Sequence, residues 1–409
     1  QPRKTLRRKC MKISKKFLAS VAAAALVATG ISAVTASSAN AAKKKPILIG
    51  AAMAATGFMA PFDGPALETA KIAVNRLNKS GGINGQKVVL KFVDTGTNPD
   101  KGQQIATQFV AEGAKLLLVT CDADINLKSA QVGERAGVLV IAPCVGSTAM
   151  GPDNGLNLGY SLGSAVPGEA AIMAEYAYTS LGRTATLFKD MSIAYTTSQC
   201  DSFAKRFKEL GGTIKSTQEF NQTQAGALDK PVTAQVAAAR ADAAGVIALC
   251  SYPGGGAEAL GAIRAAGIKT PVISGFGMDG NFWAGAVPNL SKHYVVTYAS
   301  VHGDDTKGKV RSILAAFKKA TGSDAATSGL ITGAAAIEAF ALAAKRAGST
   351  DGKKLAAEMD KFKNENLTAG PTSFTPSLHV SVTRPMAILK TTNGKTKLVK
   401  YAAAKKPTF

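Results

Sequence analysis

The stretch KLLLVTCDADINLKSAQVGERAGVLVIAPC (115–144) contains two short apolar runs on either side of a more polar segment. KLLLVT (115–120) and VLVIA (138–142) have the length and composition of strands that are buried on both faces. The residues between them predict a helix at about 125–136. A buried strand, a helix and a second buried strand form the repeating unit of a parallel α/β sheet, and this unit decides the fold class.

The same alternation extends toward the N-terminus. PILIGAAM (46–53) and QKVVLKFVD (86–94) read as two further buried strands. Between them, residues 64–80 carry apolar side chains at helical spacing, and another helix is expected around Phe109. Four strand–helix units in series predict a doubly wound parallel sheet.

A second series of similar size follows the segment GYSLGSAVPG (159–168). The final third then breaks the alternation with three predicted helices, a turn-rich extended piece at 371–376 and a hairpin around Asn393-Gly394. The predicted strands of the second series are 184–189, 213–220, 246–250 and 271–274. The final third begins with a predicted strand at 293–301, and its predicted helices are 307–321, 329–347 and 351–364.

Two parallel sheets predict two Rossmann-like lobes that face each other across a ligand cleft. Ligands of such sheets bind beyond the carboxyl ends of the strands. The loops at those ends hold short polar groups, glycines and aromatic rings, which suits a small solute. These loops are 56–62, 121–126, 144–148, 190–198, 251–256 and 276–283.

The N-terminal region reads as an export signal. From Met11 the sequence is basic, and the apolar run 17–34 precedes Ala39-Asn40-Ala41. A basic start, an apolar middle and small residues before the cut predict a secretory signal that is cleaved after Ala41. The alternative is an uncleaved membrane anchor, although the run is short for a span and contains Gly30. We therefore expect an extracytoplasmic protein, in the periplasm, in the cell envelope or secreted.

The charge of the chain does not indicate nucleic-acid binding. The full sequence carries a net charge of +22, and removing the eight basic residues of the predicted leader leaves +14. A basic balance can signal nucleic acid or membrane contact. Here the charges are scattered and are not interleaved with aromatic residues. A solvated, lysine-rich surface explains them, and we expect no nucleic-acid partner.

Four cysteines remain after the predicted cleavage: Cys121, Cys144, Cys200 and Cys250. An even number in an exported chain predicts disulfides, and four cysteines allow three pairings. Cys121 and Cys144 each follow an apolar run, as the ends of neighbouring parallel strands would. We therefore favour Cys121–Cys144 and Cys200–Cys250, although the sequence alone leaves the pairing open.

The sequence offers little that indicates catalysis. No nucleophile–base pair is suggested, and the absence of a CxxC motif together with few histidines argues against a zinc site. Residues 275–280 formally match GxGxxG after a strand. They lie late in the chain and lack the expected acidic partner, so we interpret them as a ligand-facing loop or a turn. We expect no enzyme activity, no cofactor and no metal.

A family resemblance supports this interpretation. KSGGINGQKVVLKFVD (79–94), NPDKGQQIATQFVAEG (98–113) and AGVLVIAP (136–143) resemble the leucine/isoleucine/valine-binding type of extracellular solute-binding protein. The resemblance implies a periplasmic binding protein-like fold with two Rossmann-like lobes joined by three crossing strands. It also implies a role in an ABC importer, without catalysis.

The resemblance also implies a ligand site. In amino-acid-binding members a serine and a threonine hold the carboxylate of the ligand. The matching positions here are Ala123, flanked by Asp122 and Asp124, and Gly146, followed by Ser147. Two aspartates would repel a carboxylate, so an amine, an amide or a urea-like solute is as plausible as a branched-chain amino acid. The remaining candidates are Phe62, Cys144, Tyr195, Tyr252 and Phe276, with Asp279 as the acid that would meet an ammonium group.

The sequence thus predicts the solute-binding component of an ABC importer that closes two lobes on a small polar solute. The partners would be that solute and a membrane permease, and the protein would be a monomer. A sensory ligand-binding protein is the alternative, and a secreted α/β enzyme is a weaker one. The predicted divisions are 1–41 for upstream residues and signal, 42–162 plus 302–369 for lobe 1, and 163–301 plus 370–409 for lobe 2.

Overall fold

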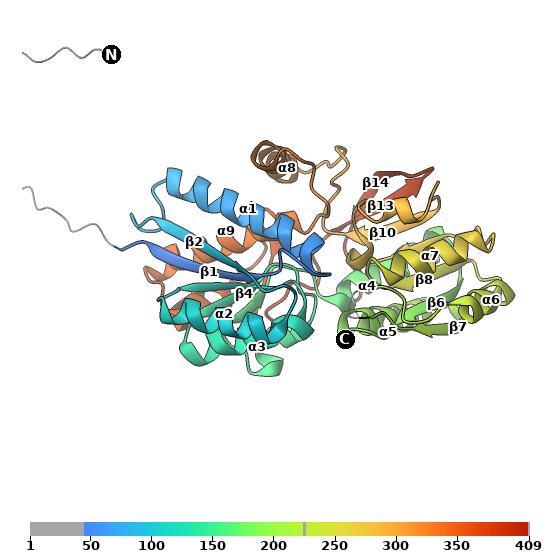
Figure 1. Ribbon diagram of the computed structural model, residues 1–409, viewed down its shortest axis with the longest axis horizontal. Helices are drawn as coiled ribbons and strands as arrows, with labels where there is room; N and C mark the ends of the chain where they lie inside the picture. Colours follow the sequence, from blue (N-terminus) through green and yellow to red (C-terminus); the bar gives the residue numbers. More distant parts are fainter. Residues whose placement is uncertain (1–44, 224–225, 408–409) are drawn as a thin grey trace, which may run out of the picture. The chain divides into compact units, whose positions relative to one another are not determined.

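The computed structural model describes residues 45–223 and 226–407, which belong to one compact unit. The predicted signal segment, 1–41, lies outside the described residues. Within the unit, two α/β sheets with their covering helices form two lobes (Figure 1). The predicted fold class is therefore confirmed.

The sheet of lobe 1 is entirely parallel, with the strand order β2-β1-β3-β4-β5. Side chains alternate between its two faces, as the two-residue period of a strand requires. Leu118 packs in the same core as helices α1 (Ala60–Lys79) and α9 (Leu330–Ala347), whereas Leu117 packs in the core under α2 (Pro99–Ala111) and α3 (Ala123–Ala136). The strands are β1 (Ile47–Met53), β2 (Val88–Asp94), β3 (Leu116–Val119), β4 (Leu139–Ala142) and β5 (Gly159–Ser161).

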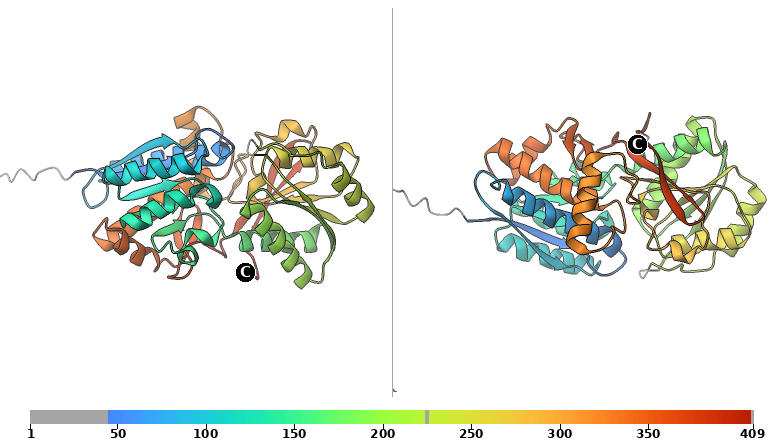
Figure 2. Two further views of the ribbon diagram at one scale, coloured as in Figure 1. Left: turned by 60° about the horizontal axis from the view of Figure 1, so that its bottom comes forward. Right: turned by 90° about the horizontal axis from the view of Figure 1, so that it is seen from above.

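Helices cover both faces of this sheet (Figure 2). Helices α1 and α9 approach closely at Gly333, where any added Cβ would collide with the carbonyl oxygen of Ala66. Only glycine therefore permits this packing distance. The lobe 1 helices are α1 (Ala60–Lys79), α2 (Pro99–Ala111), α3 (Ala123–Ala136), α8 (Gly308–Thr321), α9 (Leu330–Ala347) and α10 (Gly352–Met359).

The sheet of lobe 2 has the order β14-β13-β10-β9-β8-β6-β7. Strands β10 to β7 in this order are parallel, whereas β13 and β14 form an antiparallel hairpin at one edge. Asn393 and Gly394 turn the hairpin with positive φ angles of 49° and 71°, as predicted. The strands are β6 (Thr184–Asp190), β7 (Thr213–Phe220), β8 (Val246–Cys250), β9 (Val272–Ser274), β10 (His293–Thr297), β13 (Met386–Thr392) and β14 (Lys395–Ala402).

Two helix pairs sandwich this second sheet. Phe203 and Phe207 of α5 pack on one face, and Leu260 and Ile263 of α7 pack on the other. The apolar runs of β6 and β8 are buried because both faces are covered. The helices are α4 (Val166–Ser180), α5 (Ala194–Glu209), α6 (Thr233–Asp242) and α7 (Gly255–Ala265).

The chain passes between the two sheets three times: after β5, after β10 and after β12 (Gly370–Thr372). The buried guanidinium of Arg384 ties two of these passages together. It donates to the carbonyl oxygens of Leu162 (2.5 Å) and Gly163 (2.9 Å) and to Thr372 Oγ1 (3.0 Å). We propose that lobe 1 comprises residues 42–162 and 302–369, and that lobe 2 comprises residues 163–301 and 370–409.

Three details differ from the sequence-based expectations. The predicted strand 293–301 ends at Thr297, after which the chain leaves the second sheet. The predicted helix 351–364 ends at Met359, because residues from Glu365 onward pair as β11 (Glu365–Leu367) with β12. The crossing strand that the resemblance implies near 160–166 begins as β5, which has only three residues and pairs with β4 in the first sheet.

Candidate ligand-binding site

A cavity of about 50 Å³ lies between the carboxyl ends of the strands of the two sheets. A single water needs roughly 10–15 Å³ on this scale, so the cavity has room for a small solute. Both lobes contribute to its wall. The lining residues are Phe58, Met59, Phe62, Cys121, Asp122, Ala123, Asp124, Cys144, Val145, Gly146, Ser147, Ile193, Ala194, Tyr195, Tyr252, Phe276 and Gly277.

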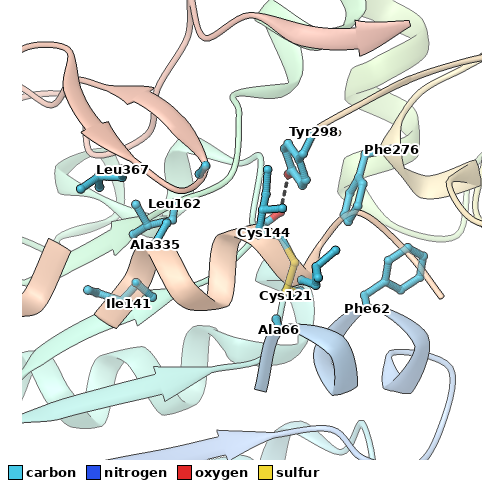
Figure 3. Packing of buried hydrophobic residues seen from close by; sticks show 14 of the residues in the cluster. Phe62, Ala66, Cys121, Ile141, Cys144, Leu162, Phe276, Tyr298, Ala335 and Leu367 are labelled. Atoms are coloured by element: carbon cyan, nitrogen blue, oxygen red, sulfur yellow. Dashed lines mark hydrogen bonds between the residues drawn. A yellow bond between two sulfur atoms is a disulfide. The ribbon is translucent and has the colours of Figure 1, made fainter. Parts of the chain in front are cut away.

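A disulfide forms part of the lobe 1 wall. Cys121 and Cys144 are bonded, with their Cα atoms 4.8 Å apart (Figure 3). The register of β3 and β4 pairs Leu118 with Ile141, and each cysteine lies three residues beyond its strand partner. The two strands therefore bring the cysteines to the same level, and the favoured pairing is confirmed.

Buried Asp63 of α1 holds two of the lobe 1 loops in place. Its carboxylate accepts the backbone N–H of Ala54, after β1, at 2.7 Å and that of Cys121, after β3, at 2.8 Å. Burial raises the pKa of this carboxyl to about 7. Asp63 thus fixes the positions of two loops relative to α1, and it does not itself line the cavity.

Two aspartates lie at the start of α3. Asp122 is the N-cap residue, and its Oδ1 accepts the N–H of Asp124 at 2.9 Å. Burial and the neighbouring charge of Asp124 raise the pKa of Asp122 to about 7. Asp124 reaches across to lobe 2, where its Oδ2 accepts the N–H of Ala194, the first residue of α5, at 2.9 Å.

On the lobe 2 side, a buried carboxylate outside the cavity lining orients the wall. Glu169 Oε1 accepts the Tyr195 hydroxyl at 2.7 Å, the Gln199 amide at 2.5 Å and the backbone N–H of Phe276 at 3.0 Å. The Tyr195 oxygen in turn accepts the N–H of Gly277 at 2.9 Å. Burial raises the pKa of Glu169 to about 7. The hydroxyl of Tyr195 is thereby held within the lobe.

Aromatic rings meet across the cavity. Phe58 lies 5.6 Å from Tyr252. Phe62 lies 5.4 Å from Phe276 in an edge-to-face arrangement, as Figure 3 shows. Each pair joins lobe 1 to lobe 2. The Tyr298 hydroxyl, just after β10, also donates to the carbonyl oxygen of Cys144 at 3.1 Å. The two lobes are therefore in contact over the cavity, as in a closed conformation.

Ten of the predicted site residues line this cavity, and Asp279 does not. Asp279 is fully buried, and its Oδ2 accepts the N–H of Ser328, just before α9, at 2.6 Å. The short 3-10 turn Phe276–Met278 turns the chain away from the cavity before Asp279. The ten that line it are Phe62, Asp122, Ala123, Asp124, Cys144, Gly146, Ser147, Tyr195, Tyr252 and Phe276.

Sequence reasoning missed several wall residues and the carboxylates behind them. Phe58 and Ile193 fell inside the loops considered, but nothing in their type singled them out. Glu169 was missed because it lies in helix α4 and not in a loop after a strand. An acid among the apolar residues of a buried helix was the one available signal.

A wider volume of about 930 Å³ adjoins the cavity. It shares Phe58, Asp124, Ile193 and Tyr252 with the smaller one. The ring pair Phe58–Tyr252 thus stands between an inner space and an outer vestibule. The second predicted disulfide, Cys200–Cys250, is also present; it joins α5 to β8 and does not line either space.

One pattern could suggest an esterase. Gly159, Ser161 and Gly163 match GxSxG, but Ser161 is fully buried and its hydroxyl donates to the carbonyl oxygen of Val145 at 2.5 Å. His379, which lies nearby, engages the Gly159 carbonyl through Nδ1 at 2.8 Å. These residues do not form the nucleophile–base contact that such chemistry requires.

Within residues 45–223 and 226–407, no group of three or more His, Cys, Asp or Glu side chains is placed to hold a metal ion. In the same part of the chain, no helix is long and apolar enough to span a membrane.

Two α/β lobes that enclose a small cavity between their strand ends define a solute-binding protein. Comparison with known proteins specifies the family. A sequence model described as "Periplasmic binding protein" matches residues 46–396. The chain belongs to the periplasmic binding protein family, and its role is to bind a solute.

Individual proteins agree with this assignment. A Leu/Ile/Val-binding protein homolog 3 from Brucella melitensis is 29% identical over 58% of this chain and 63% of its own length. A homolog 1 from Brucella abortus is 26% identical over 84% of this chain and 88% of its own length. The crystal structure of LivJ from Streptococcus pneumoniae, in complex with isoleucine, has a TM-score of 0.76 at 20% identity and covers 88% of this chain and 100% of that one.

Proposed function

We propose that this protein is the extracytoplasmic solute-binding component of an ABC importer, which captures a small polar solute when its two lobes close. The observation that supports this most directly is the cavity, whose wall combines residues of both lobes. A ligand that contacts both walls favours the closed arrangement over the open one, because it binds the two states unequally.

The contacts across the cavity indicate how closure is stabilised. The Ala194 N–H donates to Asp124, and Phe58 and Phe62 contact rings of lobe 2. Opening the lobes would break these contacts and expose the rings to water. The chain crosses between the sheets in three passages, an arrangement that suits a hinge.

Location and partners complete the proposal. We place the protein in the periplasm, in the cell envelope or outside the cell. A signal peptide would export it and would then be cleaved after Ala41. We propose a monomer that delivers its solute to a membrane permease. It would act without catalysis or a cofactor, and the ligand-binding residues would be the ten predicted ones that line the cavity.

A ligand panel tests the proposed function. The purified protein is heated with amino acids, amides, amines and small carboxylates, and the free energy of unfolding is compared. The Leu/Ile/Val names of the relatives make these three amino acids the first compounds to include. A solute at a hundred times its Kd should stabilise by about 2.7 kcal/mol. A flat response across the panel would contradict the proposal.

The same samples separate binding from catalysis. We expect any stabilising compound to be recovered chemically unchanged after prolonged incubation, measured by mass spectrometry. Turnover of that compound would instead support an enzyme on this α/β scaffold.

A further inference from the structure

The cavity has an unbalanced charge. Asp122 and Asp124 line it, whereas no Lys, Arg or His is found among the described residues that do. No described ion pair neutralises either aspartate. Because carboxylates repel at close range in a space of low dielectric constant, an anionic ligand would be disfavoured here.

Two backbone N–H groups that could bind an anion are already engaged by the protein's own aspartates. Helices α3 and α5 both begin at the cavity, and helix N-termini attract negative charge. Asp122 accepts the N–H of Asp124 at the start of α3, and Asp124 accepts the N–H of Ala194 at the start of α5. The protein's own carboxylates thus occupy one backbone donor at the start of each helix, where a ligand carboxylate could otherwise bind.

Five of the other fifteen lining residues are aromatic, and they come from both lobes. Phe58 and Phe62 come from lobe 1, and Tyr195, Tyr252 and Phe276 come from lobe 2. The negative faces of aromatic rings attract organic cations, and this attraction grows when water is excluded. The Tyr195 hydroxyl donates its hydrogen bond to Glu169, so it is not a free polar group of the wall.

We propose that the solute of this cavity is a compact organic cation without a carboxylate, such as a protonated primary amine or a small quaternary ammonium ion. Its charge lies near Asp122 and Asp124, and its alkyl groups contact the rings of both lobes. This inference rests on the proposed solute-binding function and specifies its ligand class. It departs from the amino acids that the relatives' names suggest.

The pH dependence of binding follows from the same geometry. Asp122 faces Asp124 on its own helix, Asp63 from α1 and Tyr252 from lobe 2. With its pKa raised to about 7, Asp122 is neutral in acid and charged in base. A cation should therefore bind more tightly as the pH rises from about 6 to about 8, and its binding should release protons near pH 7.

Matched ligands test the inference by titration calorimetry at pH 8. Leucine is compared with 3-methylbutylamine, which lacks its carboxylate, and with 4-methylpentanoate, which lacks its ammonium group. Choline is compared with 3,3-dimethyl-1-butanol, its neutral analogue of the same shape. We expect each cation to bind at least about tenfold more tightly than its partners.

A variant with a matched control separates charge from fold. Asp122→Asn keeps an N-cap, since Asn and Asp cap helices equally well. It should weaken cation binding at least about tenfold at pH 8 and flatten the pH dependence. Asp351→Asn is the control: Asp351 is also a helix N-cap, at α10, where it accepts the Lys354 N–H at 3.1 Å outside the cavity. It should leave binding unchanged.

The outcomes distinguish this inference from the function beneath it. Tighter binding of leucine or 4-methylpentanoate than of the amine would overturn the cation and leave solute binding intact. Equal affinity of choline and its neutral analogue would also overturn it. If no compound of the broad panel binds, the proposed function fails, and the inference fails with it.

Discussion

The two walls of the cavity are built by different means. Lobe 1 supplies charge: Asp122 and Asp124 at the start of α3, on loops braced by Asp63 and by the Cys121–Cys144 disulfide. Lobe 2 supplies shape: rings whose polar atoms are turned inward, as the Tyr195 hydroxyl is toward Glu169. We propose that the lobe 1 aspartates select the charge of the solute, whereas the rings of both lobes limit its size.

The two disulfides offer the largest test of this contrast. They close chain segments of 23 and 50 residues, so their loss should cost about 3 and about 4 kcal/mol of unfolding free energy, respectively. Replacing Cys200 and Cys250 by serine should leave affinity nearly unchanged, because neither lines the cavity. Replacing Cys121 and Cys144 should weaken ligand binding as well.

The measurements are denaturant unfolding and calorimetric titration on both double variants. Each double variant serves as the other's control, because both remove one buried bridge. Equal losses of affinity would show that the lobe 1 disulfide is no more than a stabilising crosslink, and the distinction between the walls would lose this support.

Glu169 provides the next test, on the lobe 2 side. Glu169→Gln leaves one of three donors poorly matched and should cost about 1–3 kcal/mol of unfolding free energy. The pKa of Glu169 is raised to about 7, so the native protein retains its proton between about pH 4.5 and 7, where the unfolded chain has lost it. Its contribution to stability is therefore full in acid and falls as the pH rises.

The cost of Glu169→Gln should accordingly be larger at pH 5 than at pH 8. Urea unfolding at both values measures this, with Glu358→Gln as the control, since Glu358 pairs with Lys361 on the surface. A larger cost at pH 8 would mean that the carboxylate is stabilised in its charged form by the three donors.

Much of this arrangement could be predicted from the sequence. The apolar runs at 115–120 and 138–142 form strands that are buried because both faces of their sheet are covered. The loops that follow these two strands therefore lie at the cavity. The loop positions, in turn, located Asp122 and Ser147. The positions of strands and of the loops between them depend on the local sequence, so they can be predicted from it.

What the sequence could not report depends on contacts between distant residues. Asp279 follows a strand like the other candidates, yet a short turn directs it toward Ser328, just before α9. Glu169 acts through Tyr195 and Phe276, which are 26 and 107 residues away. No spacing rule connects such positions, and only the packing of α4 against the second sheet brings them together.

The ring pair Phe58–Tyr252 tests how the two walls meet. Phe58→Ala removes a contact across the lobes and opens the passage to the outer vestibule. An aromatic pair contributes about 0.5–1.5 kcal/mol beyond burial, so affinity should fall several-fold, mainly through faster dissociation. Stopped-flow measurement of both rate constants checks this. Phe282→Ala, at an exposed ring, is the control.

The smallest effect on affinity is expected from substituting Ser147, an uncharged residue of the lobe 1 wall. Its hydroxyl accepts the N–H of Ala149 at 3.1 Å and caps a short turn. Ser147→Ala should cost about 0.5–1 kcal/mol of unfolding free energy and change the affinity for a cation less than about twofold. A tenfold loss of affinity in the titration would show that a hydroxyl, and not the aspartates alone, anchors the solute on this wall. A neutral hydroxyl can contribute that much binding free energy only if the charged aspartates do not dominate it.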